Sequence, residues 1–353
     1  MTTHFFLGAN SGEGFQSLYA DLVDLEKTRD LLVLKGGPGV GKSTFMKQVG
    51  RAAEEAGQPV EYIWCSGDPD SLDAVLLPEC AAAVVDGTSP HVVEPRYPAA
   101  VDRYVNLGRF YDVDALKKCR LEVVTHTEAY KEAYQRAFHC LKAARQVERS
   151  AFSRMAQGLD RTRLDRRISG IIARELRKKG GEEGITTRRF LGSMTHKGYI
   201  WRFDSVDALC PRVYELADRW ELGSGALARL HDAATAAGWN TIVCPNPEDL
   251  TQIRHLLIPG LGLAFVTSGD DCAYPGKPNR RLRLDAMTSS GDRARVRFAR
   301  RMTETLREEA LAALREAKAS HDALEAVYHP HVDFDGVAAL AREETNRILG
   351  YAK

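Results

Sequence analysis

The residues with the clearest chemistry lie together in residues 36–44. Four of them match the pattern G-x-x-x-x-G-K-[ST]. In such a segment the glycines let the backbone curl, so that successive N–H groups point at phosphate oxygens. Lys42 would reach the β- and γ-phosphates, and the Ser43 hydroxyl would hold Mg²⁺. The segment therefore predicts a nucleotide site, with contacts from all its residues: Gly36, Gly37, Pro38, Gly39, Val40, Gly41, Lys42, Ser43 and Thr44.

The elements on either side of this segment decide whether the pattern is meaningful. Residues 31–34 are an apolar run that suits a buried strand. After the segment, apolar residues recur at helical spacing from Phe45 to Ala56, and Gly57 ends the run. A helix there would add its partly positive N-terminus to the phosphate site. The plainer alternative is a glycine turn between a strand and a helix, with Lys42 in solvent.

A second candidate element is the small apolar run over residues 81–85, which ends in Asp86. In phosphate-loop proteins a carboxylate at the end of such a strand helps to order the Mg²⁺ shell. We therefore assign Lys42 and Asp86 to the reaction, and Ser43 and Asp86 to Mg²⁺. The competing interpretation is that Asp86 forms a turn before Gly87.

The residue after Asp86 is Gly87. Many ATPases carry a glutamate at that position, as the base that polarises the attacking water. A base in this chain must come from elsewhere, or hydrolysis is slow, or the phosphate acceptor is not water. Asp68, Asp70 and His91 are the candidates in neighbouring loops. Each of them also fits a plainer role as a helix cap or a polar surface residue.

The rest of the pattern predicts an α/β arrangement followed by helices. We expect a strand over residues 60–65, a short helix over residues 69–77 and an irregular loop over residues 90–111. From residue 112 to residue 176 the apolar residues follow three-four spacing in two stretches. This spacing predicts a helical arm whose basic clusters form a solvated face rather than a nucleic-acid surface.

Composition narrows the class of protein. The chain has 353 residues, which suggests two domains of ordinary size, and a net charge of +1 gives no general attraction to nucleic acid or acidic lipid. No apolar run approaches the roughly 20 residues that a membrane span requires, and the N-terminus does not resemble a signal peptide. The seven cysteines are widely spaced without a C-x-x-C pair. We therefore expect a cytoplasmic protein with no membrane partner.

The chain also repeats part of itself. Phe6-Leu7-Gly8 followed by Gly14 reappears as Phe190-Leu191-Gly192 followed by Gly198, and both glycine pairs are 184 residues apart. Further matches keep the same order in both halves. This order predicts a duplicated unit of sheet and helices.

The second copy lacks the phosphate-binding pattern. In the aligned segment Ser224 stands in place of the lysine, while Asp218 and Glu221 bring negative charge to the place of the phosphate. The position that corresponds to Asp86 falls in residues 265–268, with no carboxylate at the end of the strand. These two defects predict that the second half does not bind nucleotide in the usual way and is a structural or regulatory partner of the first.

These residues resemble those of a largely uncharacterised group of bacterial tandem P-loop ATPases, also described as nucleotide-kinase-like. The resemblance implies two P-loop domains in one chain and ATP as the nucleotide, and it does not settle a substrate. In similar proteins both halves can carry an intact loop, so the departure at residues 223–226 puts a second ATP site in doubt. The motifs that carry the resemblance are Phe6-Leu7-Gly8 with Gly14-Phe15, residues 36–44, Cys65-Ser66 with Asp70-Ser71-Leu72-Asp73, and Asp86-Gly87-Thr88-Ser89-Pro90-His91.

The fold class that we expect is α/β, with duplicated P-loop NTPase-type three-layer αβα domains, each with an appended helical arm. The first domain spans residues 1–182, with its arm over about residues 112–180. The second spans residues 183–353, with its arm over about residues 291–353.

Three functions remain open from the sequence. The first is an ATPase that uses Mg²⁺ and whose turnover moves the helical arms. The second is a small-molecule or nucleotide kinase that transfers the γ-phosphate to an acceptor substrate. The third is an ATP-sensing binding module that recruits a protein partner with little turnover. No guanine-reading N-K-x-D motif occurs, which favours ATP.

Overall fold

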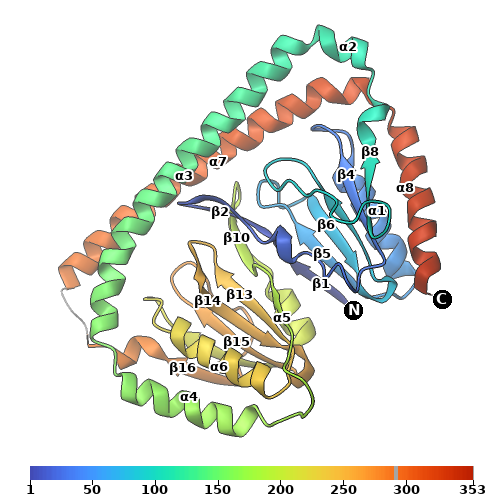
Figure 1. Ribbon diagram of the computed structural model, residues 1–353. Helices are drawn as coiled ribbons and strands as arrows, with labels where there is room; N and C mark the ends of the chain where they lie inside the picture. Colours follow the sequence, from blue (N-terminus) through green and yellow to red (C-terminus); the bar gives the residue numbers. More distant parts are fainter. Residues whose placement is uncertain (290–292, 353) are drawn as a thin grey trace.

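The computed structural model describes residues 1–289 and 293–352. The architecture is α/β: mixed sheets lie in two bodies, and long helices reach from one body to the other along one side of the molecule (Figure 1). The described residues form two six-stranded sheets and one four-stranded sheet.

The first sheet has the strand order β1-β5-β6-β7-β4-β8. β6 is antiparallel to β5 and β7, and the other neighbours are parallel. α1, Lys42–Glu55, follows β4 and packs the buried side chains of Phe45, Met46 and Val49 against this sheet. The strands are β1 Thr2–Phe5, β4 Asp30–Lys35, β5 Val60–Trp64, β6 Leu72–Leu77, β7 Ala82–Asp86 and β8 Asp102–Asn106.

The second sheet has the strand order β16-β12-β15-β14-β13-β9. Read in reverse, it matches the first sheet strand for strand, and β14 is its antiparallel member as β6 is in the first. α6, Ser224–Ala236, follows β12 as α1 follows β4, and α5, Phe203–Leu209, precedes β12. The strands are β9 Thr186–Arg188, β12 Arg212–Ala217, β13 Thr241–Asn246, β14 Asp249–Ile258, β15 Leu263–Ser268 and β16 Arg280–Arg283.

The small sheet joins the two halves. Its order is β11-β10-β2-β3, so one hairpin from each half pairs edge to edge: β2 Gly8–Ser11 with β3 Gly14–Ser17, and β10 Gly192–Thr195 with β11 Gly198–Trp201. Just before it, Phe6 and Phe190 exchange backbone hydrogen bonds of 2.9 and 2.8 Å, and both side chains are fully buried. The repeated Phe-Leu-Gly segments therefore meet in one hydrophobic core that is continuous across both halves.

The two helical arms cross between the halves. α2 Val113–Lys118 and α3 Arg120–Gln157 leave the first half, and α4 Arg161–Glu175 packs on α6 in the second. α7 Arg293–Tyr328 runs back beside α3, and α8 Phe334–Leu349 packs on α1 in the first half (Figure 1). Each arm therefore ends on the opposite half. Although α3 and α7 are long, no helix in the described part of the chain is apolar enough over its length to cross a membrane.

Several sequence expectations for elements are confirmed. The strands expected at residues 31–34, 60–65 and 81–85 are β4, β5 and β7, and α1 begins directly after Gly41. Two expectations are wrong. Residues 69–77 contain the strand β6 rather than a helix, and residues 90–111 contain β8 and a short 3-10 helix, Leu107–Phe110, rather than an irregular loop throughout.

Tertiary pairing explains the first error. Every residue of β6 is buried, because the strand lies between β5 and β7 and is covered on both faces. A short apolar run of this kind shows no alternation and reads as helix or strand with equal ease. The second arm was expected from about residue 291, which lies outside the described residues, and α7 begins at Arg293.

Candidate functional site

Residues 36–41, here the glycine loop, connect the carboxyl end of β4 to the first turn of α1. Gly39 and Gly41 have φ angles of +69° and +91°, which L side chains rarely adopt. At Gly39 space is short as well, because an added Cβ would lie 2.9 Å from His329 Cδ2. Among the described residues no side chain caps the N-terminus of α1. The first backbone N–H groups of that helix are therefore available to an anion.

Lys42 lies at the mouth of this loop. Its Nζ donates hydrogen bonds to the carbonyl oxygens of Gly36 and Gly37 at 2.7 and 3.1 Å. It also lies 3.5 Å from Asp86 Oδ2, and both side chains are largely buried. The fold thus brings together the two residues that the sequence assigned to the reaction, because β4 and β7 are adjacent parallel strands whose carboxyl ends meet at one edge.

Ser43 and Asp86 supply oxygen atoms at the same edge. Asp86 Oδ1 accepts hydrogen bonds from the Thr88 N–H at 2.9 Å and the Thr88 hydroxyl at 2.6 Å, which fixes the carboxylate and leaves Oδ2 toward Lys42. The Ser43 hydroxyl oxygen accepts the Leu72 N–H at 3.0 Å. A hydroxyl and a carboxylate are the hard oxygen donors that Mg²⁺ prefers, so the donor set fits this ion.

The C-terminal end of α7 covers the glycine loop, which the sequence did not indicate. Glu325 Oε1 accepts the Gly39 N–H at 3.2 Å across a separation of 286 residues. Beside it, the Tyr111 hydroxyl donates to the Pro38 carbonyl at 3.1 Å, and its ring packs 5.3 Å from that of Tyr328. A carboxylate thus already accepts one of the loop N–H groups that a phosphate would use.

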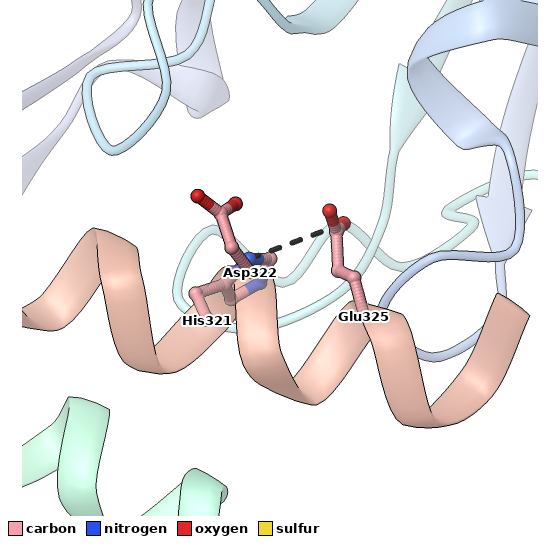
Figure 2. Close-up of side chains that lie close together, drawn as sticks. All are labelled: His321, Asp322 and Glu325. Atoms are coloured by element: carbon pink, nitrogen blue, oxygen red, sulfur yellow. Dashed lines mark ion pairs between the residues drawn. The ribbon is translucent and has the colours of Figure 1, made fainter.

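Glu325 belongs to a small cluster on α7 with His321 and Asp322 (Figure 2). Their ligand atoms lie within 4.8 Å of one another, and His321 Nδ1 is 3.9 Å from Glu325 Oε1 one helical turn away. Such a set could accept a metal ion. However, Asp322 is exposed and already forms an ion pair with Lys318, so the cluster does not by itself define a metal site.

The two acidic candidates for the base lie in different surroundings. Asp68 accepts a hydrogen bond from the Ser71 hydroxyl at 2.9 Å and lies 3.7 Å from Lys318 Nζ on α7, so it faces the arm. Asp70 is mostly exposed and pairs with Lys197 in the hairpin of the second half. The Asp70 contact lowers the pKa of that carboxyl through the hydrogen bond from Lys197.

His91 lies in the core. Only 6% of the residue is exposed, its ring stacks 4.6 Å from that of Tyr19, and its Nε2 is 3.9 Å from Asp73 Oδ1. Among the described residues neither ring nitrogen has a hydrogen-bond partner. The Tyr19 hydroxyl donates to Asp73 at 2.7 Å, and burial raises the pKa of Asp73. His91 is therefore part of a buried polar group rather than a residue on the glycine loop.

Residues 218–223, here the acidic loop, occupy the corresponding place after β12 in the second half. Glu221 has a φ of +54°, unusual for a residue other than glycine. The Asp218 carboxylate accepts three backbone N–H groups of its own loop, from Trp220, Leu222 and Gly223, at 3.2, 2.9 and 2.7 Å. Burial raises the pKa of Asp218 to about 6. Negative charge thus lies inside this loop, as the sequence predicted.

Glu221 points instead to the helical arm. It forms a two-point ion pair with Arg145 of α3, at 2.9 and 2.7 Å, and accepts the Asn246 amide at 2.9 Å. At the end of β15 the residues are Thr267 and Ser268, again without a carboxylate.

Comparisons with known proteins give no family to which the chain can be assigned. No family model matches the sequence, and neither curated proteins nor solved structures contain a match. Function must therefore be inferred from the residues and their geometry.

Proposed function

We propose that the first half of the chain binds Mg·ATP at the glycine loop and hydrolyses it. One observation carries the proposal: Lys42, in the first turn of a helix that follows two left-handed glycines, lies 3.5 Å from the carboxylate that ends the adjacent strand. A lysine, an anion-accepting helix N-terminus and a strand-end carboxylate are the parts that phosphoryl transfer needs at one point.

In this proposal each residue has a defined role. The backbone N–H groups of residues 36, 37 and 39–44 hold the phosphate oxygens, and Lys42 leaves the carbonyls of Gly36 and Gly37 to neutralise the β- and γ-phosphates. Ser43 and Asp86 would hold Mg²⁺, which supplies further positive charge to the reacting phosphate. The barrier falls mainly because this charge is positioned in advance.

The proposal gives the second half a supporting role and retains the resemblance to tandem P-loop ATPases. We infer that the two halves arose by duplication, since both sheets have the same strand order and the same single antiparallel position. In the second half the Asp218 carboxylate takes the N–H groups that phosphate would need. One active site per chain is therefore expected.

The contact from α7 occupies one N–H donor of the glycine loop. A phosphate that accepts the Gly39 N–H must displace the Glu325 carboxylate, because both are anions at one donor. Since α7 continues along α3 to the second half, nucleotide binding would shift the arms. This is the movement that turnover is proposed to drive.

The test compares Lys42→Ala with Lys47→Ala, which removes a lysine of the same helix whose Nζ donates to the Asp70 carbonyl at 2.6 Å. With ATP and Mg²⁺, the wild type and Lys47→Ala should release phosphate without an added acceptor. Lys42→Ala should release phosphate about a hundredfold or more slowly, because it loses a group that stabilises the charge of the reacting phosphate. Phosphate release that is unchanged in Lys42→Ala would overturn the proposal.

Two further measurements separate the other two functions. ADP formation that needs an added nucleotide or metabolite would establish a kinase. Thermal stabilisation by ATP without turnover, lost in Lys42→Ala, would establish a binding module. No stabilisation of the wild type by any nucleoside triphosphate would remove all three.

A further inference from the structure

A cavity of about 520 Å³ lies in the second half, at the carboxyl ends of β12, β13 and β15 and beneath α3 and α7. In open α/β sheets, ligands bind beyond the carboxyl ends of the strands. This is the edge that carries the glycine loop in the first half. The volume of the cavity is in the range of ordinary small-molecule sites. The location is therefore that of a binding site, although the acidic loop has lost the phosphate pattern.

The acidic loop closes the cavity to phosphate. The Asp218 carboxylate, which is 96% buried, already accepts the loop N–H groups of Leu222 and Gly223. A phosphate would meet this fixed negative charge at close range and find no lysine opposite it, since Ser224 stands there and its hydroxyl accepts the Ile253 N–H at 3.1 Å. The ligand of this cavity is therefore not a nucleotide bound through its phosphates.

The charges around the cavity are unbalanced toward the negative. Among the described residues, eight carboxylates but only six guanidinium groups line it. The three inner guanidiniums each have a carboxylate partner: Arg145 with Glu221 at 2.7 Å, Arg307 with Glu148 at 2.8 Å, and Arg254 with Asp271 at 2.7 Å.

Two inner carboxylates remain without a cationic partner within salt-bridge distance in the described part of the chain. They are Asp218 in the acidic loop and Glu248, whose carboxylate accepts the Gly12 N–H at 3.0 Å. A site with surplus carboxylates favours a cationic ligand. A buried carboxylate without a cationic partner is costly in free energy, and a bound cation supplies the missing positive charge.

The remaining lining can hold the body of such a ligand. The Trp220 ring lines the cavity and lies edge-on to that of Phe152 at 5.9 Å, which offers an aromatic surface to a cation or to an apolar group. Thr303 of α7 is 3% exposed, and among the described residues its hydroxyl has no hydrogen-bond partner. A buried hydroxyl without a partner is the group that a ligand amine or hydroxyl would satisfy.

We propose that this cavity binds a small organic cation, a primary amine carried on a ring or a short apolar body. The amine lies among the surplus carboxylates, and the body packs against Trp220. The proposal goes beyond ATP binding in the first half and does not depend on it. Burial raises the pKa of Glu248, so a cation beside this carboxylate would favour its ionised form.

The experiment uses the full chain and isothermal titration with benzylamine, cyclohexylmethylamine and putrescine at up to millimolar concentration. Benzyl alcohol and benzoate are the matched neutral and anionic probes. At least one amine should bind and change the tryptophan fluorescence of the protein, whereas benzoate should not bind. No binding by any of the three amines, or equal binding by benzyl alcohol, would overturn the proposal.

Variants locate the bound amine. Glu248→Gln should weaken amine binding about tenfold or more, because one of the two carboxylates without a cationic partner is lost. Glu128→Gln, on an exposed turn of α3 where its partner is Lys131, should leave binding unchanged. Trp220→Leu should weaken binding and remove the fluorescence change. Amine binding that both cavity variants leave intact, or that saturating ATP abolishes by competition, would place the amine elsewhere and overturn the proposal.

Discussion

The glycine loop and the acidic loop have the same setting and opposite chemistry. Each joins a parallel strand to a helix, and in each the fourth residue after the strand has a positive φ, +69° at Gly39 and +54° at Glu221. In each a serine in the first turn of the helix accepts a backbone N–H from the antiparallel strand, Ser43 from Leu72 and Ser224 from Ile253.

The difference is the origin of the anion. In the acidic loop it is permanent, because Asp218 is part of the loop and takes three of its N–H groups. In the glycine loop the carboxylate comes from Glu325 on a helical arm and takes one N–H. The backbone turn alone therefore does not make a phosphate site. The carboxylate that accepts the loop N–H groups must also be able to leave them.

The largest expected effect on the free energy of unfolding comes from removing the Asp218 carboxylate from the acidic loop. Asp218→Ala should lower the free energy of unfolding by about 4 kcal/mol, because three buried N–H groups lose a carboxylate acceptor. Chemical denaturation of both proteins measures the difference. Asp218→Asn keeps an acceptor and should cost about 1 kcal/mol. If Asp218→Ala is as stable as the wild type, the carboxylate does not hold this loop together.

The cavity beside the acidic loop also predicts a dependence of stability on pH, through Glu148 of α3. Burial raises the folded-state pKa of Glu148 from 4.5 to about 7, against the attraction of Arg307 and Arg145. The folded state therefore binds the proton more tightly than the unfolded state between these values. The free energy of unfolding should fall as pH rises through this window, by up to about 3 kcal/mol.

The measurement is chemical denaturation of the wild type and Glu148→Gln at a series of pH values. The variant cannot ionise at this position, so its curve should be flatter over the window by the stated amount. Glu128→Gln provides the control on the same helix, and its curve should follow that of the wild type. Parallel curves for the wild type and Glu148→Gln would show that Glu148 titrates as an ordinary glutamate.

The smallest effect concerns the removable anion of the glycine loop. Glu325→Gln removes the negative charge that competes with phosphate at the Gly39 N–H, so ATP should bind up to about tenfold more tightly, a difference of about 1.4 kcal/mol. Titration with ATP and Mg²⁺ at low ionic strength measures it. Asp322→Asn removes a neighbouring exposed charge that pairs with Lys318, and it should change the affinity less. Equal affinities in the wild type and Glu325→Gln would show that α7 leaves the loop without cost.

The predictability of the fold differed between neighbouring elements. β4, the glycine loop and α1 could be read directly, since an apolar run, glycines and helical spacing follow one another within 26 residues of chain, Asp30 to Glu55. β6 was misread because its five apolar residues and Asp73 are ordered by β5 and β7 on either side, and no local pattern records those partners. β8 was missed for a related reason, since Tyr104 is exposed and the segment follows several prolines.

The candidate site divides in the same way. The sequence by itself determined the glycine loop, Lys42, and the end of a strand at Asp86, because each depends on neighbours within a few residues. It also determined that Asp218 would bring negative charge into the second loop. Glu221 instead pairs with Arg145 of α3, a contact between distant residues that no local pattern records.

Only the tertiary structure decided which anions and cations meet. The contact between Gly39 and Glu325 joins residues 286 apart. The packing of α3 against α7 brings Arg145 to Glu221 of the acidic loop and Arg307 to the same cavity. A helical pattern shows that α3 and α7 each have an apolar stripe, but many partners could cover such a stripe. Packing of the whole chain selects one partner for each stripe. The same packing places the Glu325 carboxylate on the glycine loop and forms the charged cavity in the second half.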